Sequence, residues 1–119
     1  LILTSEQVPQ EYLTYLDSRN ISWIAAGRER IDLARVAELL ATEFGVERMA
    51  VVGGSAINTS FLDAGLLDEV SILIGAGIDG RGSMPAVFDG LPMSHSVIPL
   101  RLTDVQKFDS GAVWLRYSC

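Results

Sequence analysis

The chain has 119 residues, 49% of them hydrophobic, and a net charge of −6 at pH 7. This length suits a single domain spanning residues 1–119. The acidic net charge and the lack of a basic block argue against a nucleic-acid partner. The sequence contains no apolar run of about 18 residues, so no membrane helix is expected. One Cys (Cys119) and one His argue against a metal site, and a lone cysteine is typical of a reducing, cytoplasmic setting.

Two short apolar runs near the start predict strands. Leu1–Thr4 has the composition of a strand end, broken by Pro9, and Ile21–Ala25 has that of a strand ending at Gly27. The segment between them, Glu11–Asp17, predicts a short helix or a turn. This strand–helix–strand order favours parallel pairing.

An amphipathic segment follows at Asp32–Phe44. Its apolar residues at positions 33, 36, 37, 40 and 44 share one face of a helix. Asp32 can cap the N-terminus of this helix, and Gly45 can end it. The apolar run after it, from Val46 or Arg48 to Val52, predicts a buried strand.

The second half predicts one more helix, then strands. The helix should run from Ser55 to about Ala64 and stop at Gly65, and Glu69–Ile74 should be a strand. The side chains expected to face inward from the helix are Ile57, Phe61 and Leu62.

The last third begins with a long loop. Gly75–Pro92 is rich in Gly and Pro, whereas Ser96–Lys107 and Ala112–Tyr117 alternate as two strands of a hairpin around Asp109–Gly111. The chain as a whole therefore predicts an α/β fold with a mostly parallel sheet and an antiparallel C-terminal hairpin.

The glycine pair Gly53-Gly54 is the strongest functional signal. It joins an apolar run to the start of a helix, where the first N–H groups lack internal partners and no Cβ blocks an anion. Ser55 can cap the helix or hydrogen-bond a phosphate. By this chemistry alone, a phosphate site and a plain tight turn both remain open.

A second glycine motif carries less information. Gly75–Gly80 matches the letters GxGxxG after a strand, but the dinucleotide fingerprint also needs a helix opening at that turn. The continuation Arg81–Pro85 is a poor helix, and no acidic residue follows at a second strand end. We interpret this motif as a flexible loop.

Polar residues that follow the first two predicted strands are candidates for ligand binding. Thr4 and Ser5 follow one strand end, where α/β folds place ligand loops or simple turns. Arg28 and Arg30 follow the other strand and could meet a ribose phosphate through charge-assisted hydrogen bonds. A solvated loop with ordinary charges is the alternative for these arginines.

No nucleophilic or acid–base set is apparent. His95 is the only imidazole, and we interpret it as a surface or structural residue. Asp68 and Glu69 begin a strand and point to opposite faces, so they do not form a catalytic pair. The catalytic residues stay unassigned.

Several motifs together resemble a known family. These motifs are Gly53-Gly54, Asn58, Leu62, the run Ala64–Val70, Gly80-x-Gly82 and Phe88. They are similar to the reductase domain of the riboflavin-biosynthesis deaminase-reductases and, more broadly, to the dihydrofolate-reductase-like superfamily. The opening LILTSEQ resembles the segment with which those reductases hold the adenosine 2′-phosphate.

This resemblance implies a three-layer α/β/α fold and an NADPH-dependent reductase acting on a heterocyclic or sugar-derived small molecule. The substrate could be 5-amino-6-(5-phosphoribosylamino)uracil of riboflavin biosynthesis, or that of an uncharacterised relative. Hairpin strands could also join two copies as a homodimer. The residues that the resemblance assigns to the cofactor are Thr4, Ser5, Gly27, Arg28, Gly53, Gly54, Ser55, Ala56, Ile57 and Asn58.

The chain departs from the family pattern twice. Val52 stands where the riboflavin-pathway reductases commonly carry a Glu that helps hold substrate. The family's first two strands and first helix are also missing, and their loss would leave unpaired backbone groups inside the sheet. We therefore expect the C-terminal half of a reductase, completed by an N-terminal segment or a separate chain.

Two other functions remain open. A non-catalytic nucleotide-binding or assembly module would bind NADPH without consuming it. A flavodoxin-like domain would bind a flavin mononucleotide instead. Cofactor binding and turnover separate these possibilities.

Overall fold

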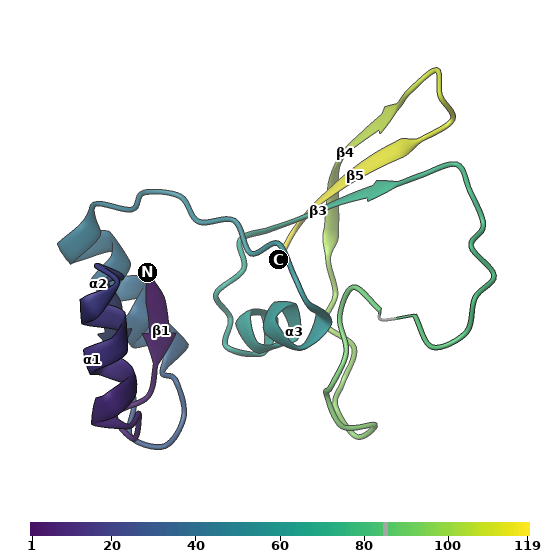
Figure 1. Ribbon diagram of the computed structural model, residues 1–119. Helices are drawn as coiled ribbons and strands as arrows, with labels where there is room; N and C mark the ends of the chain where they lie inside the picture. Colours follow the sequence, from purple (N-terminus) through teal and green to yellow (C-terminus); the bar gives the residue numbers. More distant parts are fainter. Residues whose placement is uncertain (85) are drawn as a thin grey trace. The chain divides into compact units, whose positions relative to one another are not determined.

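The computed structural model describes residues 1–84 and 86–119 (Figure 1). By its internal contacts the chain divides into two compact units, Leu1–Ala50 and Val51–Cys119. Each unit is described by itself below. No helix in the described part of the chain is long and apolar enough to cross a membrane.

The first unit contains a two-stranded parallel sheet and two helices. Strand β1 (Ile2–Thr4) pairs with β2 (Trp23–Ala25), and helix α1 (Gln10–Ser18) lies between them in sequence. Helix α2 (Leu33–Phe44) follows. The parallel pairing expected here is therefore confirmed. The core holds the buried residues Ile24, Ala26 and Val36, with Leu3, Leu39 and Leu40 packed against them.

Both predicted ends of α2 are confirmed. The Asp32 carboxylate accepts a 2.9 Å hydrogen bond from the Arg35 N–H, which satisfies one of the free donors at the helix start. Gly45 follows the helix in the left-handed conformation at φ 65°, which L side chains adopt at a cost. The helix is thus bounded by local chemistry.

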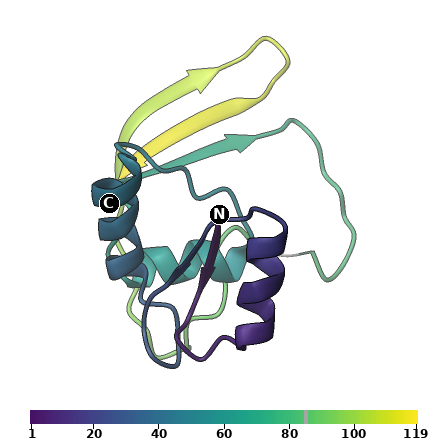
Figure 2. The same ribbon diagram turned by 60° about the vertical axis from the view of Figure 1, so that its left-hand side comes forward.

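The second unit contains helix α3 (Ser55–Asp63) and a three-stranded antiparallel sheet. The sheet order is β3 (Glu69–Ile74), β5 (Val113–Ser118) and β4 (Arg101–Lys107), so β5 is the central strand (Figure 2). The β4–β5 hairpin and β3 confirm the strands expected there. The first hairpin strand is shorter than predicted, because it begins at Arg101 rather than at Ser96.

The buried strand expected from Val46 or Arg48 to Val52 is wrong. Residues 45–54 form neither helix nor strand, and Val52 is 93% exposed. A strand needs a neighbour for its backbone hydrogen bonds. Every described strand pairs within β1–β2 or within β3–β5–β4, so the run finds no partner there.

The mostly parallel sheet is also wrong for this chain. The described strands form one parallel pairing, β1–β2, and two antiparallel pairings, β3–β5 and β4–β5. The reason is that β3 takes the second strand of the hairpin as its neighbour. The α/β character of the prediction is retained.

The inward face of α3 differs in one residue from the prediction. Phe61 is buried and Leu62 is half-buried as expected, but Ile57 is 52% exposed and Thr59 is buried instead. Thr59 Oγ1 accepts a 2.8 Å hydrogen bond from the Asp89 N–H, which turns this side of the helix inward. Ile57 lies about 200° around the helix from Thr59 and therefore faces outward.

Candidate functional site

The predicted residues of the first unit meet at one edge of the small sheet. Strands β1 and β2 are parallel, so the residues after them lie at the same edge. The Ala26 N–H donates to Thr4 O at 3.0 Å, and the Glu6 N–H donates to Gly27 O at 2.8 Å. Thr4, Ser5, Gly27 and Arg28 are therefore brought together.

Gly27 is needed for the close turn at this edge. Its φ is +86°, and an added Cβ would lie 2.1 Å from Arg30 O and 2.9 Å from Asp32 N. Only glycine tolerates both the positive φ and this approach. The turn leaves the Arg28 side chain exposed, where it can meet a solute.

The predicted residues of the second unit surround the start of α3. Gly53 has a φ of +136°, and Gly54 occupies the N-cap position in extended conformation without a side-chain capping bond. An added Cβ at either glycine would meet nothing within 4 Å in the part of the chain that the structure describes. The backbone there is open to an approaching group.

Three backbone donors at this helix start are free. The N–H groups of Ser55, Ala56 and Ile57 have no acceptor among residues 1–84 and 86–119, and the first amide of α3 with an intrahelical bond is that of Asn58, to Gly54 O at 3.0 Å. Free donors at a helix start favour an anion such as a phosphate. The start of α3 therefore offers donors that an anion could accept hydrogen bonds from.

The next two residues of α3 are engaged by a distant loop. Asn58 Nδ2 donates to Val87 O at 2.8 Å, and Thr59 Oγ1 accepts from the Asp89 N–H at 2.8 Å. Asn58 Oδ1 is buried, and no donor to it is found in the described part of the chain. The amide nitrogen of Asn58 is therefore already occupied by protein.

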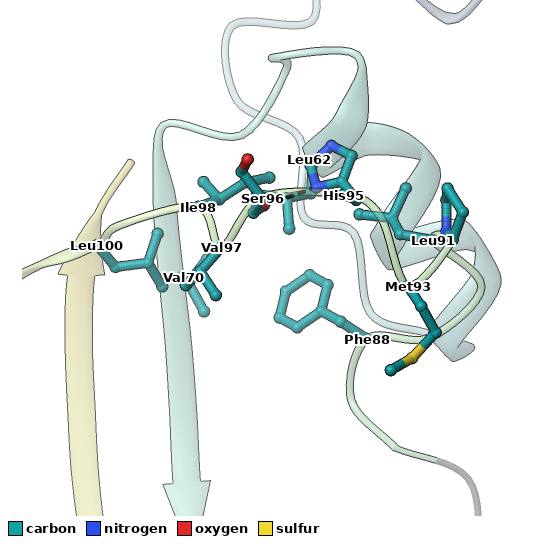
Figure 3. Close-up of a pocket in the computed structure, with 11 residues that line it drawn as sticks. Leu62, Val70, Phe88, Leu91, Met93, His95, Ser96, Val97, Ile98 and Leu100 are labelled. Atoms are coloured by element: carbon teal, nitrogen blue, oxygen red, sulfur yellow. Dashed lines mark hydrogen bonds between the residues drawn. The ribbon is translucent and has the colours of Figure 1, made fainter.

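An apolar cavity of about 420 Å³ lies beside α3 in the second unit (Figure 3). Phe88, which lies between the two loop residues that bond to α3, points into it together with Leu62 from the helix and Val70 from β3. The remaining lining residues are Leu91, Pro92, Met93, His95, Ser96, Val97, Ile98 and Leu100.

His95 lies at this cavity with two polar neighbours. Its Nδ1 is 2.7 Å from Ser96 O, and its Nε2 is 3.5 Å from Asp63 Oδ1. The carbonyl contact requires the proton on Nδ1. Both contacts are to the protein, which agrees with the interpretation of His95 as a structural residue.

The GxGxxG segment is a loop, as interpreted from the sequence. The Gly77 N–H donates to Gly75 O, and no helix begins in the described residues 75–84. Within it the Arg81 side chain hydrogen-bonds Asp79 and lowers the pKa of that carboxyl. Pro85, at the end of the predicted Arg81–Pro85 continuation, lies outside the described residues.

Sequence reasoning missed the loop that contacts α3. Val87 and Asp89 contribute only backbone groups, so their side chains carry no signal of the contact. The partners are 29 and 30 residues apart, beyond any local pattern. Phe88 in the family resemblance was the one pointer to this segment.

Comparison with known sequences identifies relatives. The sequence pattern of the RibD C-terminal domain matches residues 1–114. A 2,5-diamino-6-ribosylamino-4(3H)-pyrimidinone 5′-phosphate reductase from Methanothermobacter thermautotrophicus is 34% identical over 111 residues, covering 93% of this chain and 50% of the relative. The reductase of the same name from Archaeoglobus fulgidus is 31% identical over 91 residues, covering 76% and 40%. The chain thus spans half or less of these relatives.

Solved structures share the fold. A pyrimidine reductase-like protein from Corynebacterium diphtheriae aligns with a TM-score of 0.78 at 17% identity, covering 98% of this chain and 48% of that one. Acinetobacter baumannii RibD aligns with a TM-score of 0.68 at 19% identity, covering 98% and 30%. These likenesses support the α/β fold.

Proposed function

The chain belongs to the RibD C-terminal domain family, and from this membership we propose that it is the cofactor-binding half of an NADPH-dependent reductase. The substrate proposed is a ribosylaminopyrimidine phosphate of the kind named for the two archaeal relatives. Val52 stands where the family commonly has a substrate-holding Glu, so the proposal includes a related substrate that does not need this carboxylate.

The free donors at the start of α3 carry this proposal. The N–H groups of Ser55, Ala56 and Ile57 follow an open glycine pair and would hold the pyrophosphate of NADPH. Gly53 supplies the positive φ that directs the chain into the helix.

The edge of the β1–β2 sheet would hold the adenosine end. Thr4 and Ser5 offer hydroxyl groups to the 2′-phosphate, and Arg28 offers a guanidinium for charge-assisted hydrogen bonds. Gly27 would shape the turn that presents Arg28. A preference for NADPH over NADH would follow from these contacts.

When bound, NADPH supplies a hydride to a carbon of the substrate. The residues of this chain would bind and orient NADPH relative to the substrate, so that the hydride transfer becomes effectively a unimolecular step. No residue of the chain is assigned as a proton donor. The proposed catalysis therefore depends mainly on placement and on exclusion of water.

We also propose a dihydrofolate-reductase-like arrangement completed from outside this chain. The apolar run before Gly53 has no strand partner among the described residues, and the relatives are about twice as long as the chain. An N-terminal segment or chain would pair with this run. We propose that the hairpin strands join two such proteins as a homodimer. We also propose that the protein is located in the cytoplasm.

Titration of the whole protein with NADPH, followed by assay of NADPH oxidation with the archaeal reductases' substrate and other pyrimidines, tests the function. Micromolar binding and oxidation with one of these substrates are expected. Binding without turnover on any substrate would favour the non-catalytic nucleotide-binding module. Preference for a flavin mononucleotide would contradict the proposed function.

A further inference from the structure

Helix α3 is tied to residues 87–89 by two hydrogen bonds from adjacent side chains. We propose that Asn58 and Thr59 are positioning residues, whose bonds to this loop set the direction of the free N–H groups at the helix start. The proposal rests on the proposed function in that these N–H groups are taken to hold the NADPH pyrophosphate.

The two bonds restrain rotation of the helix about its own axis. Asn58 and Thr59 are adjacent, so their side chains leave the helix about 100° apart. With one bond alone, the helix could still rotate about that bond. The bonds to Val87 O and to the Asp89 N–H are both 2.8 Å long and leave the helix in two different directions, so together they restrain its rotation. The roll of α3 is thereby defined.

This restraint acts directly beside the free donors. The Asn58 N–H is the first in α3 to bond within the helix, and the free N–H groups of Ser55, Ala56 and Ile57 immediately precede it. Hydrogen bonds weaken steeply when the donor angle departs from linearity. A change in helix roll would therefore misdirect all of these donors together.

The loop also carries a half-buried apolar side chain between its two bonds to α3. This residue is Phe88, which lies between Val87 and Asp89 in sequence and points into the apolar cavity. Leu62 and Val70 line the same cavity (Figure 3). Loss of a single hydrogen bond leaves this apolar side chain in the lining of the cavity. The helix start can then be released without loss of the loop.

Thr59→Val removes the hydroxyl acceptor with little change in shape, and Thr59→Ser is the matched control that keeps it. In the whole protein, Thr59→Val should weaken NADPH binding about tenfold, the equivalent of one lost hydrogen bond. Thr59→Ser should restore it. Adenosine 2′-monophosphate, which lacks the pyrophosphate, should bind both variants and the parent equally.

The direction of the donors can be measured without a cofactor. Residual dipolar couplings of the N–H groups of residues 55–57 should change in Thr59→Val and stay at parent values in Thr59→Ser. Should Thr59→Val not fold, Asn58→Leu removes the other bond together with the buried Oδ1 that lacks a described donor. The same changes in couplings and affinity are then expected.

Unchanged couplings in a folded variant would overturn the positioning role, as would a lower unfolding midpoint with unchanged NADPH affinity. Failure of the parent protein to bind NADPH would instead defeat the proposed function. In that case altered couplings would still support the restraint on the helix start.

Discussion

Trp114 Nε1 donates a 2.7 Å hydrogen bond to Ser71 Oγ and so joins β5 to β3. Ser71 pairs with Arg116 and Trp114 pairs with Leu73, which makes the two side chains diagonal neighbours on one face of the sheet. The Arg116 guanidinium lies 5.0 Å from the Trp114 ring centroid and 3.3 Å from Asp104 on β4. One chain of contacts therefore links the three strands.

Ser71→Ala should lower the free energy of unfolding by about 1 kcal/mol, because the Trp114 N–H loses its protein acceptor on this face. Urea unfolding followed by far-UV circular dichroism measures the change. Ser71→Thr keeps a hydroxyl and should stay close to the parent. Equal destabilisation by both variants would mean that the bond contributes nothing.

Gly27→Ala should destabilise the protein by about 3 kcal/mol or more, since it adds a clash with Arg30 O to the cost of a positive φ. Gly45→Ala is the matched control. Gly45 also has a positive φ, but its added Cβ would meet nothing within 4 Å, so a loss of only about 1 kcal/mol is expected. Thermal unfolding of both variants distinguishes the clash from the backbone cost, and equal losses would argue against the close approach.

Gly54→Val should abolish NADPH binding while the fold persists. The φ of Gly54 is −66°, which valine adopts, and the added Cβ would meet no atom of residues 1–84 and 86–119 within 4 Å. The side chain would instead occupy the space proposed for the pyrophosphate. Isothermal titration with NADPH, alongside a circular dichroism spectrum, checks both parts, and unchanged binding would reduce the glycine pair to a tight turn.

Arg28→Ala should weaken NADPH binding more than NADH binding, because only NADPH carries the 2′-phosphate proposed to meet this guanidinium. Arg28 is exposed, so its removal should leave the unfolding midpoint within experimental error. Arg35→Ala, which removes an exposed arginine from α2, is the control for a general loss of positive charge. Equal losses for the two cofactors would refute the proposed role.

Local signals in the sequence determined several elements correctly. The apolar spacing with Asp32 and Gly45 at its ends placed α2, and the bounds of β3 were predicted as Glu69–Ile74. Helix periodicity, capping and strand alternation act over a few residues, so they can be interpreted without a tertiary structure. The same local motifs carried the resemblance that the family match over residues 1–114 confirmed.

Local sequence signals predicted only part of the candidate site. The resemblance placed Gly27 near Thr4 and Ser5, and the glycine pair predicted the open start of α3. The loop at residues 87–89 could not be predicted, since it binds α3 through backbone groups about 30 residues away. The relation between the two predicted groups of cofactor residues stays a prediction.

The family, the two ends of α2 and the glycine pair could be recognised from the sequence by itself, because each signal lies in residues that are close together along the chain. Tertiary structure alone decided that β3 pairs with β5, that the apolar run ending at Val52 forms no strand, and that Thr59 rather than Ile57 turns inward. Strand pairing and helix roll depend on which distant backbone groups supply hydrogen bonds, and apolar patterning does not specify those partners.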